Sequence, residues 1–370
     1  MRKKLEKKGK SFLIQVLKLL LRNRPVQDKV GLSAVKKILV IRQDDRIGNL
    51  ILTTPLLLAL RKSFPKAKIS FLSSFASAEV FSGSNLMDEL LTLEKRRYIR
   101  NPFAFVSQIL SLREERFDLA FDCSDENHFS FGHGMWIYLS GAKYRIGHKR
   151  EKSDLFLNIE VPQVNYTRHA TEMHLDLLRF LVPGVSDCLP FLEVKAQEME
   201  SIRNYLEKMG ITNEDFLVGI NLGGTGKKRW EIRNFIELGK WLKEKENVKT
   251  IYIWGPEERE LVKGLEVSGV LSEILPLPKL SALLQRCNLF ISSDSGIMHL
   301  STAVGTPTLA IFIQSDPVKF SPKGNKDKII SKIDGKIDSN EVLEEACGMV
   351  KELSRMKHAV ASGFTPHAEM

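Results

Sequence analysis

The chain has 370 residues, 43% of them hydrophobic and 27% charged, and it carries a formal net charge of +10. This length favours two domains, and the composition is that of an ordinary globular protein with ample apolar material for two cores. Six Lys or Arg and one Glu fall in residues 1–10, so the rest of the chain is only mildly basic. The excess charge does not require a nucleic-acid groove, and no pattern of interleaved aromatic and basic residues supports one.

The cysteines exclude two further classes of protein. Cys123, Cys188, Cys287 and Cys347 lie far apart and form no C-x-x-C pair. This spacing suggests neither a zinc site nor a disulfide framework. We therefore expect buried free thiols in a reducing cytosol.

Residues 1–36 are predicted to form a basic amphipathic N-terminal extension. Its apolar run at 12–21 is too short to span a bilayer, which needs about 20 residues. The sequence RNRP at 22–25 stands where a signal peptide would carry small residues. Two interpretations stay open. The extension is either a helix that lies on an anionic membrane surface, at the inner face of the cytoplasmic membrane, or a helix that packs on the body of a cytoplasmic protein.

Residues 37–183 are predicted to form an N-terminal domain in which strands alternate with helices. Short runs rich in β-branched residues, such as KKILVIR at 36–42, are typical of buried parallel strands. The strands are predicted at 36–42, 67–74, 89–94, 117–123 and 144–148. The helices are predicted at 48–63, 75–83, 102–114, 129–140 and 171–182, with 150–166 irregular. This alternation predicts an α/β domain with a mostly parallel sheet.

A second alternating series follows a linker at 184–194, which is rich in turn formers. Residues 195–356 are predicted to form the C-terminal domain, and residues 357–370 a tail. The strands are predicted at 216–222, 249–254, 288–293 and 307–312. The helices are predicted at 231–246, 257–268, 279–286, 296–304 and 339–355. Two doubly wound domains in tandem predict a central cleft that both sets of strand carboxyl ends face.

Four strand-to-helix turns hold nearly all the unusual polar residues. The first is IRQDDRIGNLILTTP at 41–55. It lacks G-x-G-x-x-G, so a dinucleotide fingerprint is absent. Gly48 suits a tight turn, and Asp44 or Asp45 is either a base or a cap of the following helix.

The second turn is NLGGTGKKRW at 221–230. Its glycines, its helix N-terminus and its lysines favour an anion, although the G-x-x-x-x-G-K-[ST] phosphate motif does not fit. The alternative is a flexible loop with a solvated basic tip. Because the turn directly follows a core-type strand, we expect it to bind phosphate. The residues concerned are Gly223, Gly224, Thr225, Gly226 and Lys228.

The third and fourth turns are IYIWGPEERE at 251–260 and ISSDSGIMHLSTAVGTP at 291–307. Glu257 or Glu258 begins a helix and either caps it or accepts hydrogen bonds from ribose hydroxyls. In the fourth turn, Ser295 offers a cap and Gly296 lets a ligand approach the backbone. His299, taken alone, is typical of a structural histidine, but the group as a whole indicates an anion or hydroxyl site.

These turns resemble a known family. SSDSGIMHLSTAVGTPTLAIF and ILVIRQDDRIGNLILTTPLLLALRKSFP are similar to the C-terminal and N-terminal signatures of glycosyltransferase family 9, the heptosyltransferases of lipopolysaccharide core synthesis. GGTGKKRW and IWGPEE lie between them in the expected order. The resemblance covers residues 36–355. It implies a GT-B architecture of two Rossmann-like domains and an inverting, metal-independent transfer of a sugar from a nucleotide diphosphate, typically ADP-heptose.

The resemblance also implies roles for individual residues. Lys228 matches a lysine that contacts the donor phosphates, and Glu258 or Glu257 matches an acid that holds the ribose. Asp294 matches a residue that binds hydroxyls of the donor sugar. Ser295, Gly296 and His299 match the helix start that faces the diphosphate, and Gly48 matches the turn glycine of the first signature.

One position departs from the family pattern. Heptosyltransferases usually have Gly-Asp in the first turn, with the Asp as catalytic base, whereas this chain has Gly48-Asn49. An amide cannot accept a proton as a carboxylate does. Either Asp45 serves, which we favour, or Asp44 serves, or the mechanism or acceptor differs or the chain is inactive.

The resemblance therefore implies a cytoplasmic glycosyltransferase that needs neither a metal nor another cofactor, and that is membrane-associated under the first interpretation of residues 1–36. Its expected partners are a nucleotide-diphosphate sugar and a phosphorylated glycolipid or glycan, which Arg42 and Arg46 would suit on the acceptor side. Two alternatives remain: a catalytically degenerate binding or scaffold protein, and a nucleotide-sugar epimerase or hydrolase.

Overall fold

The computed structural model describes residues 23, 25–26, 30–125, 130–163, 168–224, 226–332 and 336–361. Most of the predicted extension and most of the predicted tail lie outside these residues. The chain divides into two compact units. Unit 1 takes the residues up to Asp45, Thr53–Ala78 and Asn85–Cys188, and unit 2 takes Arg46–Leu52, Glu79–Ser84 and the residues from Leu189 onward. The boundaries expected from the sequence stay predictions.

Unit 1 is built on a six-stranded sheet in which every neighbouring pair is parallel. The strands are β1 (Lys37–Arg42), β2 (Lys68–Ser74), β3 (Glu89–Leu93), β4 (Leu119–Asp122), β5 (Tyr144–His148) and β6 (Ile159–Val161). Their order is β3-β2-β1-β4-β5-β6, which is the doubly wound order of dinucleotide-binding domains. β1 is buried because it lies between β2 and β4 under helices on both faces.

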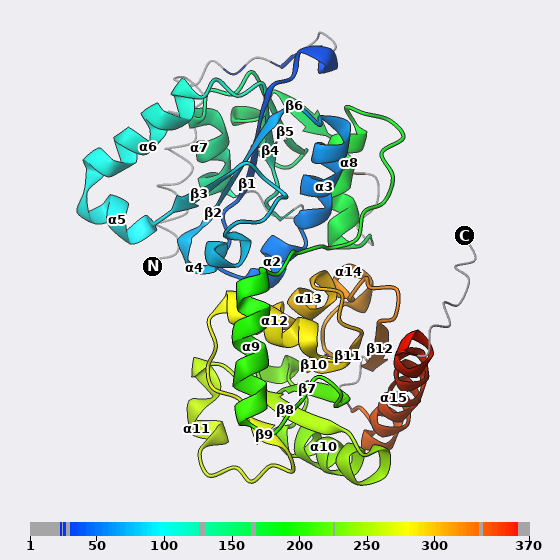
Figure 1. Ribbon diagram of the computed structural model, residues 1–370. Coiled ribbons are helices and arrows are strands. Elements are labelled where there is room, and N and C mark those ends of the chain that lie inside the picture. The colour runs from blue at the N-terminus through cyan, green and yellow to red at the C-terminus, as the bar shows by residue number, and fades with distance from the viewer. Residues whose placement is uncertain are drawn as a thin grey trace, which may run out of the picture. The chain divides into compact units, whose positions relative to one another are not determined.

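The helices of unit 1 cover both faces of this sheet. Figure 1 shows α6 and α7 on one face and α3 and α8 on the other. The core on the α6–α7 face contains Leu39, Phe117 and Trp136. The helices are α3 (Thr54–Ser63), α4 (Phe75–Ala78), α5 (Lys95–Arg100), α6 (Pro102–Glu114), α7 (Phe131–Leu139) and α8 (Ala170–Arg179), with short 3-10 helices η1 (Leu32–Ala34) and η3 (Ser153–Leu155).

Unit 2 repeats the same arrangement. Its parallel sheet has the order β9-β8-β7-β10-β11-β12, which is again the doubly wound order. The strands are β7 (Leu217–Asn221), β8 (Lys249–Ile253), β9 (Val270–Leu271), β10 (Leu289–Ser293), β11 (Thr308–Ile313) and β12 (Lys328–Lys332). The predicted α/β class with doubly wound sheets is therefore confirmed.

The helices of unit 2 also lie on two faces. α10 and α15 share a core with the sheet, whereas α9, α12, α13 and α2 pack on one another. The helices are α2 (Ile47–Ile51), α9 (Ala196–Lys208), α10 (Ile232–Glu246), α11 (Arg259–Val262), α12 (Leu277–Arg286), α13 (Gly296–Ala303), α14 (Pro317–Phe320) and α15 (Ser339–Ala361). The 3-10 helices are η2 (Glu79–Phe81), η4 (Gly226–Lys228) and η5 (Pro256–Glu258).

Several elements differ from the expectation. The single helix predicted at 48–63 is two helices, α2 and α3, and Pro55 stands at the start of the second. Proline has no N–H for the carbonyl four residues earlier and clashes with it, which breaks the helix. The helix predicted at 257–268 ends at Val262. The strands β6, β9 and β12 and the helices α5, α9 and α14 were not predicted.

Candidate active site

The candidate site in unit 2 lies where the strand order of the sheet reverses. β7 and β10 are neighbours, and the chain leaves them toward opposite sides of the sheet. In open α/β sheets, ligands bind beside the carboxyl ends of the strands at this point. The second and fourth turns of the sequence analysis follow these two strands, so the topology brings them together.

Asn221 connects the two turns. It is 1% exposed at the end of β7. Its Oδ1 accepts from the Gly223 amide at 2.9 Å, and its Nδ2 donates to Ser292 Oγ at 2.9 Å and to Ser295 Oγ at 3.2 Å. Nδ2 also lies 3.2 Å from the Gly223 carbonyl oxygen. One buried amide therefore fixes the glycine-rich turn against the start of α13.

Two further contacts join the segment that follows the glycine-rich turn to the end of β10. Lys228 Nζ lies 3.2 Å from Asp294 Oδ2, and the lysine side chain is 44% exposed. The Trp230 amide donates to Ser293 Oγ at 2.9 Å. The phosphate-binding candidate and the hydroxyl-binding candidate thus form an ion pair, and the lysine keeps enough exposure to reach a ligand.

The structure distinguishes Glu258 from Glu257. Glu258 is 5% exposed, whereas Glu257 is exposed. Glu258 Oε2 accepts from the Gly255 amide at 3.1 Å, and Oε1 lies 3.7 Å from Arg229 Nη1. A Cβ atom at Gly223 would stand 3.5 Å from Glu258 Oε2, so the carboxylate borders the glycine-rich turn. The contacts of Glu258 thus place it beside the glycine-rich turn.

The glycine-rich turn needs its glycines for two different reasons. Gly224 has φ +152° and Gly226 has φ +53°, which are backbone conformations that other residues rarely adopt. Gly223 instead leaves room beside Asn221 and Glu258. Thr225 lies outside the described residues.

Gly48 and Gly296 serve a close approach of two helices. A Cβ at Gly296 would stand 2.5 Å from Ile47 Cγ2, and a Cβ at Gly48 would stand 2.9 Å from His299 Cδ2. α2 and α13 therefore touch almost backbone to backbone within unit 2. We expected Gly296 to admit a ligand, but α2 occupies the space beside its Cα. Ser295 caps α13, with its Oγ accepting from the Met298 amide at 3.3 Å.

The charged residues of the first turn belong to unit 1 up to Asp45. Arg42 is 7% exposed; it donates to the Cys123 carbonyl, and its Nη2 lies 3.3 Å from Asp44 Oδ2. Asp45 is exposed and accepts a hydrogen bond from Ser74 Oγ. Arg46 is also exposed, and Asn49 is half-buried in α2. Arg42 thus ties β1 to β4, while Asp45 and Arg46 face solvent.

A buried charged cluster at the end of β4 was missed by the sequence analysis. Asp122 is 1% exposed, and its Oδ2 lies 2.5 Å from Arg150 Nη2. Burial alone would raise the pKa of Asp122, but Arg150 and His133 outweigh it and hold that pKa below its ordinary value. Asp122 and Arg150 are 28 residues apart, so no local pattern could have found the pair.

His133 adjoins this cluster. Burial lowers the pKa of His133 to about 4, although the charge of Asp122 opposes the shift. Its Nε2 accepts from the Gln43 amide at 2.8 Å, so the proton of the neutral ring is on Nδ1, which lies 2.9 Å from Ser130 Oγ. The histidine therefore holds the first turn in place.

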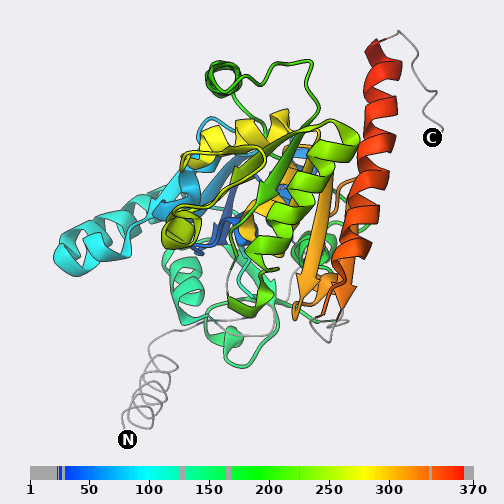
Figure 2. The same cartoon turned by 90° about the horizontal axis from the view of Figure 1, so that it is seen from below.

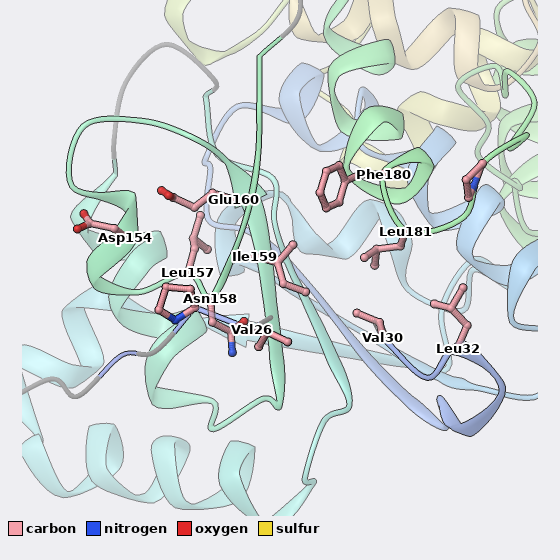
Figure 3. Close-up of a pocket in the computed structure, with 12 residues that line it drawn as sticks. Val26, Val30, Leu32, Asp154, Leu157, Asn158, Ile159, Glu160, Phe180 and Leu181 are labelled. Atoms are coloured by element: carbon pink, nitrogen blue, oxygen red, sulfur yellow. The ribbon is translucent and has the colours of Figure 1, made fainter. Parts of the chain in front are cut away.

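A hollow of about 670 Å³ lies elsewhere in unit 1, and Figure 3 draws the residues that line it. It lies along β6 and the end of α8, and its lining includes Val26, Val30, Ile159 and Phe180, with Asp154 and Glu160 at one side. None of the site residues predicted from the sequence lines it.

Neither a candidate metal site nor a membrane-spanning helix is present among the described residues. No group of three or more His, Cys, Asp or Glu side chains in this part of the chain is placed to hold a metal ion. None of the helices that the structure describes combines the length and the apolar composition needed to cross a membrane.

The glycosyltransferase family 9 (heptosyltransferase) model matches residues 106–346, which is more than half of the chain. The chain belongs to this family. It is 22% identical over 293 residues to lipopolysaccharide heptosyltransferase 3 of Escherichia coli, an alignment that covers 74% of this chain and 82% of the relative. The protein is therefore a glycosyltransferase of the heptosyltransferase family.

Solved structures share the fold. The family 9 glycosyltransferase of Veillonella parvula superposes with a TM-score of 0.76 at 22% identity, covering 86% of this chain and 97% of that one. The E. coli ADP-heptose lipopolysaccharide heptosyltransferase II gives a TM-score of 0.70 at 22% identity, covering 85% of this chain and 99% of that one. The expected GT-B fold of two Rossmann-like units is thus confirmed.

Proposed function

We propose that this glycosyltransferase is an inverting, metal-independent enzyme that transfers heptose from ADP-heptose to a lipopolysaccharide-core or related glycan. The observation that carries the proposal is the convergence of Lys228, Asp294, Glu258 and the start of α13 at the switch point of unit 2. The E. coli ADP-heptose lipopolysaccharide heptosyltransferase II, which shares this fold, supports ADP-heptose as the donor.

The donor is assigned to unit 2. Lys228 and the N-terminal end of α13 provide positive charge for a diphosphate, which would otherwise call for a metal ion. Glu258 supplies a buried carboxylate for ribose hydroxyls, and Asp294 supplies one for the sugar. In this scheme, Lys228 exchanges its ion pair with Asp294 for one with the diphosphate. The Asp294 carboxylate is then available to bind hydroxyls of the donor sugar.

The reaction then balances without a cofactor. An oxygen of an acceptor hydroxyl forms a bond to the anomeric carbon of the donor sugar, and the bond from that carbon to the diphosphate oxygen breaks. The hydroxyl proton passes to a carboxylate base, and the electron pair of the broken bond leaves with ADP. Attack from the side opposite the leaving group inverts the anomeric configuration.

We assign the base to Asp45, in agreement with the sequence interpretation. Asp44 pairs with the buried Arg42, which suits a residue that shapes the turn. Asp45 is exposed, and a neutral hydroxyl, that of Ser74, donates to it. Arg46 is exposed, which suits an acceptor-side cation for a phosphorylated glycolipid or glycan, whereas Arg42 is only 7% exposed.

We also propose that the enzyme works at the inner face of the cytoplasmic membrane, where a glycolipid acceptor would be presented. The sequence supports this through the cationic, amphipathic extension at 1–36, of which residues 1–22 lie outside the described residues.

Replacement of Lys228 by methionine tests the donor assignment. Hydrogen bonds to charged groups contribute about 1.5–3 kcal/mol, so we expect ADP to bind Lys228→Met about ten to a hundred times more weakly by calorimetry. Lys351, which pairs with Glu246 on the surface of unit 2, offers a matched control. ADP should bind the unaltered enzyme more tightly than UDP or GDP.

Equal ADP affinity in Lys228→Met and Lys351→Met would overturn the phosphate assignment. Loss of sugar transfer in EDTA, restored by a divalent metal, would overturn the metal-free scheme. Consumption of ADP-heptose without any acceptor product would favour the hydrolase alternative.

A further inference from the structure

One helical segment of unit 1 carries an unusual group of exposed apolar side chains. Eleven large hydrophobic side chains are exposed in the described part of the chain, and four of them lie within 99–110. Ile99 in α5 is 82% exposed and Phe103 in α6 is 85% exposed. Val106 lies three residues after Phe103, and Leu110 lies four residues after Val106. At these spacings the three side chains share one face of α6.

A different face of the same helices is firmly packed. Phe105, Ile109 and the buried Leu112 contact the core of unit 1. The rings of Tyr98, Phe105 and Trp136 lie within 5.4–5.9 Å of one another and join α5, α6 and α7. The exposed side chains therefore stand on anchored helices, and their exposure is not the result of a frayed end.

The charged residues of this segment, between Glu94 and Glu114, are all basic. The sequence has no acidic residue between Glu94 and Glu114, and it has Lys95 and four arginines there. Arg96, Arg97, Arg100 and Arg113 are exposed, and none of them forms an ion pair with another described residue. Other arginines of unit 1, such as Arg61 and Arg168, are paired with carboxylates.

We propose that this face docks on an anionic lipid bilayer. The α5–α6 surface, as we define it, consists of Arg96, Arg97, Ile99, Arg100, Phe103, Val106 and Leu110. Apolar side chains that enter the acyl boundary and arginines that reach the lipid phosphates are the two attractions that hold a peripheral helix on a membrane. This inference deepens the proposed location at the membrane, on which it rests, but it does not depend on which donor or acceptor is used.

The place of the surface in the fold agrees with this role. β3 is an edge strand of the sheet, and α5 and α6 follow it directly. Figures 1 and 2 both show these two helices, in cyan, along the outer edge of unit 1. A flat membrane can therefore approach them without first meeting the sheet.

Charge argues against a second copy of the chain as the occupant. A two-fold interface places the same patch of both subunits face to face. Here such an interface would oppose the unpaired arginines of one copy to those of the other, and like charges at close range are unfavourable. An anionic partner neutralises them, and a bilayer does so whatever the register of contact.

The test measures binding of the full chain to vesicles by flotation. We expect binding to vesicles of equal parts phosphatidylcholine and phosphatidylglycerol, and little binding to phosphatidylcholine alone. Full burial of an Ile or Phe side chain changes an equilibrium constant by about tenfold or more, so the double variant I99S/F103S should bind at least about tenfold more weakly. The variant L189S/I329S removes two exposed apolar side chains of unit 2 and should bind as the unaltered protein does.

Two further measurements keep the test decisive. Each arginine near an anionic surface contributes about a fivefold change in binding, so R96Q/R97Q/R100Q should bind far more weakly and less dependently on salt. The variant F103W keeps an aromatic side chain, and its added fluorescence should shift to the blue and be quenched by brominated lipid. Unchanged binding by I99S/F103S and no lipid quenching in F103W would overturn the proposal. So would a concentration-dependent dimer that I99S/F103S abolishes, because that result assigns the surface to a second copy.

Discussion

Asn221 shows how one side chain can set the geometry of two turns. Its amide group both accepts and donates, so it can bind the Gly223 amide on one side and two serine hydroxyls on the other. A carboxylate of the same shape can accept the hydrogen bond from the Gly223 amide but cannot donate to the serine hydroxyls. Asn221 is therefore a positioning residue in our scheme, because it acts on the donor through the two turns and does not contact it.

Asn221→Asp should raise the KM for the sugar donor by about tenfold, since several hydrogen bonds of about 1 kcal/mol each are lost or weakened. A smaller effect on kcat is expected, because the acceptor-side base is unaltered. Steady-state kinetics measures both quantities. Asn213→Asp, on an exposed loop, is the control and should match the unaltered enzyme. A fall in kcat with no change in KM would contradict the positioning role.

His133 predicts a pH dependence of stability. Its pKa is about 4 in the folded chain against an ordinary value of 6.5, so the unfolded chain binds more protons between these values. The free energy of unfolding should therefore fall as the pH is lowered through this window, by about 3 kcal/mol from this group. The charges that face the ring are those of Asp122, Arg42, Arg150 and Asp44.

His133→Gln should flatten that dependence. Urea unfolding at about pH 7 and about pH 4.5 measures it for both proteins. The glutamine carbonyl can still accept from the Gln43 amide, so the turn keeps its hydrogen bond at either pH. An equal loss of stability in both proteins would show that other groups cause the acid sensitivity.

At the scale of elements, the contact between α2 and α13 depends on two missing side chains. A Cβ at Gly48 would stand 2.9 Å from His299 and 3.1 Å from the Gly296 backbone. A backbone atom cannot move aside as the end of a side chain can. The N-terminal and C-terminal signatures of the family therefore meet in one helix pair, α2 and α13, inside unit 2. Gly48 and Gly296 both have a packing role there.

Gly48→Ala should lower the free energy of unfolding by about 1–3 kcal/mol, the usual cost of overpacking. Gly348→Ala is a matched control, because a Cβ there meets nothing within 4 Å in the middle of α15. That control should gain about 0.5–1 kcal/mol from the better helix propensity of alanine. Chemical denaturation of the two variants checks both signs. Equal stability of the two would contradict the close packing of α2 on α13.

Much of this arrangement could be predicted from the sequence. The apolar runs before the glycine-rich turn and before Asp294 identified two parallel strands, and parallel strands end at one edge of a sheet. The structure places Lys228 beside Asp294 at that edge. Asn221 escaped notice because it reads as the last residue of a strand, and Arg150 because its partner is distant in sequence. β12 was missed because charged residues begin and end it.

At the scale of the whole molecule, the proposal divides the work between the two units. The donor residues lie in unit 2, and the proposed base lies in unit 1. Asp45→Asn should therefore lower kcat by about a hundredfold or more, within the range of general base catalysis, and leave ADP binding unchanged. Initial rates and the rise in Tm on adding ADP measure the two effects separately.

Asp44→Asn serves as the comparison for that experiment. It should act mainly on stability, because it loses the ion pair with Arg42. A loss of kcat in Asp44→Asn with Asp45→Asn fully active would exchange their assignments. Activity in both variants would show that neither aspartate is the base.

The division of the chain has a consequence for its evolution. The backbone passes between the units five times, at residues 45/46, 52/53, 78/79, 84/85 and 188/189. A recombination event near residue 188 would inherit Ile47 and Gly48 from one parent and Gly296 and His299 from the other. The two signatures of the family must therefore be inherited as a matched set. In viable hybrids between distant relatives, we expect a second short exchange that brings both signatures from the same parent.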